Sequence, residues 1–179
     1  MKSKQTSGQG KVLIVTALAV ALFSLGIFVG NSISGYYAYQ VETDMAGIGC
    51  LSTDDFSAAT ISVSDSLVYL TSGCMRMSIV TTPEQTMSID AGIRKLESER
   101  PLAHDIMANQ LQVFGIEVAM VKIHTVEDGV YYADLILKSG NKLLRMDARP
   151  SDAIAIAVRT NAPVYVSNEL MDEEGFAIC

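Results

Sequence analysis

The chain has 179 residues, enough for one folded domain and an appendage. It carries 13 basic and 20 acidic residues. Three of the basic residues precede Val12, so the remaining chain has a net charge of −10. This charge excludes binding of nucleic acid by a generally basic surface, and a nucleic-acid partner would require a local basic cleft, divalent cations or high salt. P-loop, dinucleotide-binding, nucleophile-elbow and H-E-x-x-H motifs are missing, which argues against those enzyme classes.

An uncharged stretch near the N-terminus predicts a membrane anchor. Residues 12–29 contain no charge, and a helix of that length spans about 27 Å, close to the hydrocarbon thickness of a bilayer. Lysines precede this stretch, and no Lys or Arg follows until Arg76, which keeps the N-terminus in the cytoplasm. We therefore expect a cytoplasmic basic tail at 1–11, a single transmembrane helix at 12–30 and a spacer at 31–40, with the domain outside the cytoplasm.

The alternative for this stretch is a cleaved signal peptide with its cleavage site near Ser34-Gly35 or Ala38. Its length and the lack of a clear A-x-A site favour the anchor. Both interpretations export the folded domain.

Short β-type runs come next, separated by turn residues. The four predicted strands are Val41–Ile48, Ala58–Val63, Ser66–Thr71 and Met75–Thr81. Pro83 suits the first position of a helix that runs to about Glu97, with Thr82 and Gln85 as a capping box. A second helix opens at Arg100-Pro101 and is ended by Gly115.

The second half of the chain repeats this order. Strong hairpin turns join three predicted strands, Glu117–Thr125, Val130–Leu137 and Lys142–Asp147. A helix starting at Pro150, a strand at Pro163–Ser167 and a short acidic helix at Glu169–Glu174 complete the chain. Pro83 and Pro150 are 67 residues apart and each follows antiparallel strands. The pattern predicts an α+β fold, with an internal duplication of a three-strand-plus-helix unit.

Charged residues gather where the last strand of the second unit meets its helix. The segment Met146–Val158 reads M-D-A-R-P-S-D-A-I-A-I-A-V. Its apolar part, Ala153–Val158, predicts a buried helix. Asp147, Arg149 and Asp152 must then lie at the rim of the core, a plausible place for chemistry.

A similar block lies upstream, R-P-L-A-H-D at Arg100–Asp105. Together with D-A-R-P-S-D-A-I-A-I-A, it resembles the most recognisable blocks of the bifunctional nuclease domain family. The resemblance extends over about 41–175, leaving 176–179 as a C-terminal tail. It implies a barrel-like, mostly antiparallel sheet with packed helices, and hydrolysis of DNA and RNA.

The residues of these blocks suit phosphodiester hydrolysis. We expect His104, Asp147 and Asp152 to be catalytic, and Arg100 and Arg149 to bind the substrate phosphate. Asp147, Asp152 and Asp105 are the predicted ligands of a divalent cation, Mg²⁺ or Mn²⁺. Each has a structural alternative as well: the two helix-starting aspartates suit the helix dipole, and the arginine can pair with one of them. His124, in a predicted hairpin strand, is expected to be structural.

The cysteines leave two interpretations open. Cys50 and Cys74 either form a disulfide between neighbouring strands or are two separate buried thiols. Cys179 is expected to be exposed.

Two functions follow from the sequence. The first is a membrane-anchored nuclease that cuts DNA or RNA, with nucleic acid as its partner. The second is a non-catalytic extracytoplasmic binding or oligomerisation module, favoured by the −10 charge and by apolar strand residues suited to a homo-oligomer interface.

Overall fold

A computed structural model describes residues 40–43, 48–96 and 99–179, all within one compact unit that extends from residue 39 to the C-terminus. The predicted basic tail, anchor and most of the spacer lie outside these residues. Within them, no helix combines the length and the apolar character needed to cross a membrane.

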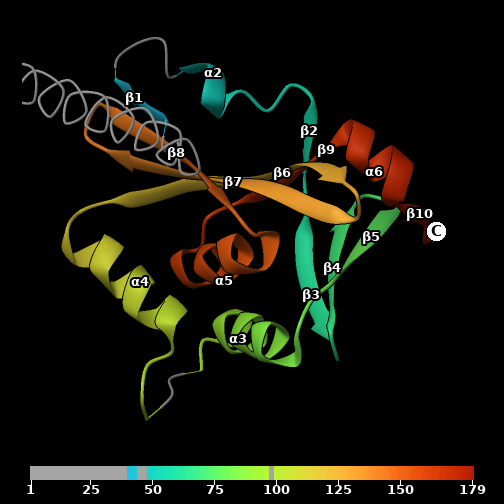
Figure 1. Ribbon diagram of the computed structural model, residues 1–179, viewed down its shortest axis with the longest axis horizontal. Coiled ribbons are helices and arrows are strands. Elements are labelled where there is room, and N and C mark those ends of the chain that lie inside the picture. The colour runs from blue at the N-terminus through green and yellow to red at the C-terminus, as the bar shows by residue number, and fades with distance from the viewer. Residues whose placement is uncertain (1–39, 44–47, 97–98) are drawn as a thin grey trace, which may run out of the picture. The chain divides into compact units, whose positions relative to one another are not determined.

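The described strands form two sheets (Figure 1). The larger sheet has the order β1-β8-β7-β6-β9-β2, and only the β6–β9 pair is parallel. Its strands are β1 Gln40–Thr43, β8 Lys142–Ala148, β7 Val130–Ser139, β6 Glu117–Glu127, β9 Val164–Ser167 and β2 Phe56–Ala58.

The smaller sheet has the order β10-β5-β4-β3 and is antiparallel throughout. It contains β10 Phe176–Ala177, β5 Met75–Val80, β4 Leu67–Ser72 and β3 Thr60–Ser64. The predicted α+β class and antiparallel pairing are confirmed. The expected barrel is not closed in the described residues, because β1 and β2, the edge strands of the larger sheet, pair neither with each other nor with the smaller sheet.

The structure describes five helices: α2 Ile48–Leu51, α3 Pro83–Ile93, α4 Ala103–Val113, α5 Pro150–Thr160 and α6 Asn168–Glu174. Pro83 and Pro150 begin their helices as predicted, and the Thr82 hydroxyl accepts the Gln85 N–H as an N-cap. The reciprocal half of the predicted capping box is absent, because the Gln85 side chain bonds to Asp152 instead. Helix α4 begins three residues later than predicted, since Pro101 precedes its N-cap at Leu102.

Helix α5 is the centre of the core, as its apolar run predicts. Ala153, Ile154, Ala155 and Ala157 have no exposed surface, and α5 packs against β6 and β7 of the larger sheet. Burying one side chain the size of Ile154 contributes roughly 1.5–3 kcal/mol. Helices α3 and α4 both pack on α5, so polar groups on these three helices are brought together (Figure 1).

The element order of the predicted repeat is confirmed. Strands β3, β4 and β5 lead into α3, and strands β6, β7 and β8 lead into α5. The two helices pack against each other, and Gln85 contacts Asp152, which lies 67 residues further along the chain. Common ancestry of the two units remains an interpretation.

The disulfide joins Cys74 to Cys179, 105 residues apart. Both interpretations of the Cys50 and Cys74 pair are therefore wrong. The reason is the strand β10, which pairs with β5 in the register Ala177↔Met75 and brings the last residue beside Cys74. Residues 176–179, expected to be a tail, are part of the smaller sheet and this crosslink.

Candidate functional site

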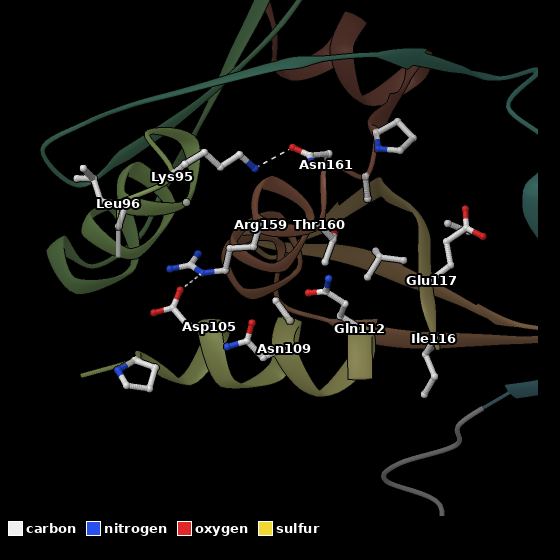
Figure 2. A pocket seen from close by; sticks show the side chains of 18 residues that line it. Lys95, Leu96, Asp105, Asn109, Gln112, Ile116, Glu117, Arg159, Thr160 and Asn161 are labelled. Atoms are coloured by element: carbon white, nitrogen blue, oxygen red, sulfur yellow. Dashed lines mark hydrogen bonds and ion pairs between the residues drawn. The ribbon is translucent and has the colours of Figure 1, made fainter. Parts of the chain in front are cut away.

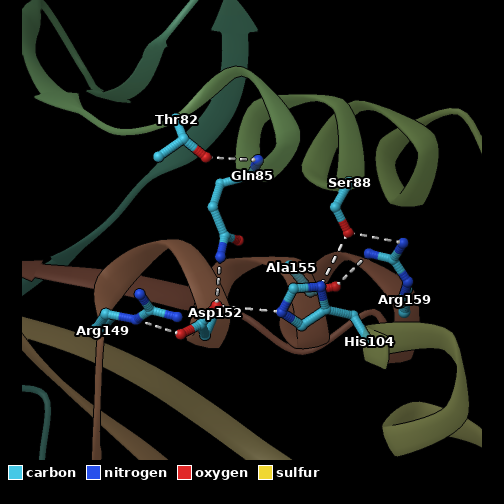
Figure 3. Close-up of polar contacts among 8 residues, drawn as sticks. All are labelled: Thr82, Gln85, Ser88, His104, Arg149, Asp152, Ala155 and Arg159. Carbon is cyan, nitrogen blue, oxygen red and sulfur yellow. Dashed lines mark hydrogen bonds and ion pairs between the residues drawn. The ribbon is translucent and has the colours of Figure 1, made fainter. Parts of the chain in front are cut away.

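Three residues predicted for the site meet at the N-terminus of α5 (Figure 3). The Asp152 carboxylate lies 3.3 Å from the His104 Nε2 and accepts a 2.7 Å hydrogen bond from the Arg149 Nε. The side chains of His104 and Asp152 are 16% and 26% exposed, and that of Arg149 is 74% exposed. A histidine, a carboxylate and an accessible guanidinium therefore share one partly open position.

Side chains from α3 and the end of α5 extend this cluster, which we call the helix network (Figure 3). Gln85 Nε2 donates to the Asp152 Oδ1 at 3.0 Å. Ser88 Oγ lies 2.9 Å from the His104 Nδ1, and the Arg159 Nη2 donates to Ser88 at 3.3 Å. The helix network thus ties α3, α4 and α5 together.

These contacts determine which ring nitrogen of a neutral His104 carries the hydrogen. The Asp152 carboxylate only accepts hydrogen bonds, so the ring nitrogen facing it must donate, and the Ser88 hydroxyl, which accepts from Arg159, donates its own hydrogen to the His104 Nδ1. The Nδ1 is then the acceptor, and the hydrogen of the ring lies on Nε2, facing Asp152. Ser88 and Arg159 therefore orient the histidine without contacting Asp152.

Replacing Asp152 with alanine should remove this tautomer preference, because the acceptor that faces Nε2 is lost. The ¹⁵N shifts of the ring nitrogens measure it directly, and only two histidines have to be assigned. We expect the Nε2–H tautomer of His104 in the unmodified chain and a mixture of tautomers in Asp152→Ala. The control Ser62→Ala, on the exposed side of β3, should leave the spectrum of His104 unchanged. An Nδ1–H tautomer in the unmodified chain would contradict this arrangement.

Asp105 faces away from the His104–Asp152 pair and binds the buried Arg159. Its Oδ1 lies 2.5 Å from the Arg159 Nε, and its Oδ2 accepts the Leu102 N–H at 2.7 Å. The Arg159 side chain is only 7% exposed. Burial is the largest influence on the Asp105 carboxyl and raises its pKa, but the bonds from Arg159 and Leu102 outweigh burial and lower the pKa below its usual value.

The remaining predicted residues lie apart from this cluster. Arg100 is exposed in the segment before α4 and forms no hydrogen bond or ion pair with the described residues. Asp147 is on the other face of the larger sheet, because side chains alternate along β8 and its neighbour Met146 packs against the core. The prediction that Asp147 joins His104 and Asp152 is therefore wrong in its geometry.

Asp147 lines a separate cavity of about 470 Å³, which we call the sheet-face pocket. Its wall contains charged residues of β6, β7 and β8, with α2 and Phe56 beside them: Gly49, Cys50, Phe56, Lys122, His124, Asp134, Arg145 and Asp147. Burial lowers the pKa of Lys122. Burial also raises the pKa of Asp134, although the nearby charges of His124 and Arg145 act to lower it. His124, expected to be structural, is part of this pocket.

An open cavity of about 750 Å³ lies on the other side of Arg159 (Figure 2). Its wall is formed by the ends of α3 and α5, one face of α4 and the start of β6. Lys95 reaches across its edge to the Asn161 side chain at 2.8 Å and to the Val158 carbonyl at 2.6 Å. Its wall contains both cations, Lys95 and Arg159, and carboxylates, Asp105 and Glu117.

Comparison with known proteins identifies the family. Residues 68–178, more than half of the chain, match the family model of the bifunctional nuclease domain. The chain belongs to the bifunctional nuclease domain family. The resemblance of the two sequence blocks is thereby confirmed, and the helix network and the sheet-face pocket both lie within this domain, apart from the α2 and Phe56 wall of the pocket.

Several curated relatives share this domain. An uncharacterized protein of Mycobacterium tuberculosis is 35% identical over 83 residues, which cover 46% of this chain and 49% of the relative. Bifunctional nuclease 2 of Arabidopsis thaliana is 30% identical over 103 residues, covering 56% of this chain and 31% of the relative. Bifunctional nuclease 2 of Oryza sativa subsp. japonica is 32% identical over 100 residues, covering 54% and 31%. The chain thus spans about half the length of the mycobacterial relative and about a third of the plant proteins.

The three predicted metal ligands of this bifunctional nuclease domain do not form one site. Asp105 is bound by Arg159, Asp152 is bound by Arg149 and Gln85, and Asp147 lies on the opposite face of the sheet. Within the described ranges, no group of three or more His, Cys, Asp or Glu side chains is placed to hold a metal ion. We therefore derive no catalytic step through a shared cation at these residues.

Two residues of the helix network, Arg159 and Ser88, were not predicted as site residues from the sequence. Arg159 is seven residues after Asp152, so both lie on the same face of α5, and this spacing was a usable signal. Ser88 carried no such signal, since its role depends on how α3 packs against α4 and α5.

Proposed function

We propose that this chain hydrolyses phosphodiester bonds in DNA or RNA, with its reaction centre at His104, Arg149 and Asp152. Membership of the bifunctional nuclease domain family and the names of the plant relatives support the substrate class. The observation that carries the proposal is the meeting of these three side chains, from the starts of α4 and α5, at one partly exposed position.

The contacts of each residue suit a distinct step. Arg149 uses Nε to bind Asp152, and its two terminal nitrogens form no hydrogen bond within the described residues, which leaves both to hold a phosphate. In its protonated form, His104 could transfer the Nε2 hydrogen, which faces Asp152 at 3.3 Å, to the leaving oxygen and return to the neutral imidazole. Asp152 orients both partners. Arg100, exposed ahead of α4 and outside the helix network, would contact a more distant phosphate of the same substrate.

The divalent cation and the export of the domain are further parts of the proposal. Mg²⁺ or Mn²⁺ would reduce the repulsion between nucleic acid and a chain of net charge −10 after its basic tail. The uncharged stretch 12–30 supports a membrane anchor with the domain outside the cytoplasm. The Cys74–Cys179 disulfide supports export as well, since disulfides persist mainly in oxidising compartments.

Cleavage of labelled single-stranded and double-stranded DNA and RNA by the purified full-length chain tests this function, with Mg²⁺, with Mn²⁺ and with a chelator. We expect His104→Ala and Asp152→Asn each to reduce the cleavage rate at least about 100-fold, the usual contribution of general acid–base catalysis. The matched controls are Gln110→Ala, exposed on the same helix as His104, and Asp128→Asn, in the β6–β7 turn. Neither control should change the rate.

The alternative is a non-catalytic binding or oligomerisation module. Two observations favour it: the Asp152 carboxylate already accepts three contacts from the protein, and α4 with its C-cap exposes the apolar side chains of Ile106, Val113 and Phe114. Under this alternative, no nucleic acid is cut under any cation condition, and the full-length chain sediments as an oligomer that Phe114→Ser weakens.

A further inference from the structure

The charged side chains of the sheet-face pocket are not hydrogen-bonded to one another, unlike those of the helix network. His124 Nε2 lies 3.8 Å and Arg145 Nη1 lies 4.0 Å from the Asp134 carboxylate, beyond hydrogen-bond range. The Asp147 carboxylate forms no ion pair or hydrogen bond within the described part of the chain. Hydrogen-bond donors and acceptors therefore face the same cavity, and their hydrogen-bonding capacity is not used up by one another.

The strand register explains why these groups converge. Lys122 is paired with Asp134 across β6 and β7, and Asp134 is paired with Asp147 across β7 and β8. Side chains that are directly opposite on neighbouring strands lie on the same face of a sheet. This face is opposite to the one covered by α5, because Leu135 and Met146, which alternate with Asp134 and Asp147, belong to the core. The pocket is thus separate from the helix network.

Lys122 places a positive charge at the inner wall of this pocket. The residue is 6% exposed, lies with its Nζ 4.8 Å from the centre of the Phe56 ring, and donates to the Ser52 carbonyl. No carboxylate of the described residues lies within 4.0 Å of this ammonium. Since a lysine ammonium has three hydrogens, Lys122 retains donor capacity for an anion in the pocket. The more distant carboxylates of Asp134 and Asp54 attract this ammonium, but burial is the larger influence and lowers the pKa of Lys122, so an anion bound in the pocket would stabilise the charge.

We propose that the sheet-face pocket binds a phosphomonoester carried on a hydroxyl-bearing body such as a ribose. Lys122, Arg145 and His124 would donate to the phosphate, and Asp134 and Asp147 would accept from hydroxyl groups. The volume of about 470 Å³ is within the range of small-molecule sites and exceeds what inorganic phosphate alone requires.

The combination of groups selects this class of ligand. A phosphomonoester carries a charge of about −1.5 to −2 near neutral pH and three acceptor oxygens, which suit an arginine fork together with a lysine point charge. A simple anion would leave Asp134 and Asp147 without donors and would be repelled by both. A ligand that combines the phosphate with hydroxyl donors satisfies both kinds of group. This inference is independent of nuclease activity, because it requires no phosphodiester.

Isothermal titration of the full-length chain with four probes tests the proposal: AMP, ribose 5-phosphate, inorganic phosphate and adenosine. We expect AMP or ribose 5-phosphate to bind at least tenfold more tightly than adenosine and than inorganic phosphate. Tighter binding of AMP would indicate a nucleotide as the occupant, and equal affinities would indicate a sugar phosphate. Both results support the proposal.

Variants locate the site. Arg145→Gln and Lys122→Met should each weaken binding of the tighter ester at least tenfold, and Lys142→Gln, exposed on the same strand as Arg145, should not. Because Arg145 is 43% exposed, its substitution should leave the fold intact even if Lys122→Met unfolds the chain. The proposal is overturned if no phosphate-bearing probe binds at millimolar concentration, if adenosine or inorganic phosphate binds as tightly as the esters, or if Arg145→Gln leaves binding unchanged.

Discussion

Replacing Asp105 with alanine should lower the free energy of unfolding by about 3 kcal/mol, because it leaves the buried guanidinium of Arg159 without its carboxylate. The Arg159 side chain is 7% exposed, and its Nε hydrogen is directed at Asp105 at 2.5 Å. The substitution also removes the acceptor for the Leu102 N–H at the start of α4. Urea unfolding followed by circular dichroism measures the loss.

A double-mutant cycle separates the cost of leaving the Arg159 charge without a carboxylate from the other effects of removing Asp105. Arg159→Met combined with Asp105→Ala should recover much of the lost free energy, since an apolar side chain of similar length does not require a partner. The matched control is Asp90→Ala, which breaks the exposed Asp90–Arg94 pair of α3 and should cost less than about 1 kcal/mol. Equal losses for Asp105→Ala and Asp90→Ala would contradict the burial of the Arg159 charge.

The same pair gives a pH dependence whose sign follows from the pKa of Asp105. The folded protein lowers this pKa below that of the unfolded chain. At a pH near these two pKa values, the folded state therefore binds fewer protons than the unfolded state. The stabilisation by Asp105 is therefore complete above about pH 5 and is lost as the pH falls through the folded pKa. The difference in unfolding free energy between the unmodified chain and Asp105→Ala should shrink accordingly below about pH 4.

Replacing Cys179 with serine should lower the free energy of unfolding by about 4–5 kcal/mol under oxidising conditions. The disulfide to Cys74 closes a loop with a sequence separation of 105 residues, and a crosslink over such a length removes much of the conformational entropy of the unfolded chain. It also holds the two-residue strand β10 against β5. Chemical unfolding with and without a reductant measures this contribution.

Reductant provides the control for the disulfide. It should destabilise the unmodified chain to the level of Cys179→Ser and should have no further effect on Cys179→Ser. Cys74→Ser should match Cys179→Ser. A chain whose unfolding midpoint is the same with and without reductant would contradict the Cys74–Cys179 crosslink.

Local sequence signals predicted the helices and strands well, but they did not predict how these elements pack together. Pro83 and Pro150 mark their helix starts, because a proline at the first helical position loses no hydrogen bond. The division of the strands between two sheets was not predictable, since it depends on the β6–β9 parallel pairing of distant segments. The disulfide was missed for the same reason: β10 has only two residues, and its pairing with β5 is a tertiary effect.

The candidate site was predicted in part. His104 and Asp152 meet because α4 and α5 pack together, and their positions at the starts of these helices were visible in the sequence. Asp147 was grouped with them because it is near Asp152 in sequence. Strand alternation on β8 instead directs it to the opposite face, beside Lys122 and Asp134. The sheet-face pocket could not be predicted, since its charged residues come from three strands whose register the sequence does not specify.

The most direct measurement for the central proposal is the nuclease rate of the His104→Ala chain divided by that of the Gln110→Ala chain. It should be made on whichever nucleic acid the unmodified protein cuts fastest. We predict a ratio of about 0.01 or lower, because only His104 places a ring nitrogen against Asp152 beside the open guanidinium of Arg149. A ratio near one, with both chains folded and active, would show that phosphodiester hydrolysis does not occur at the helix network.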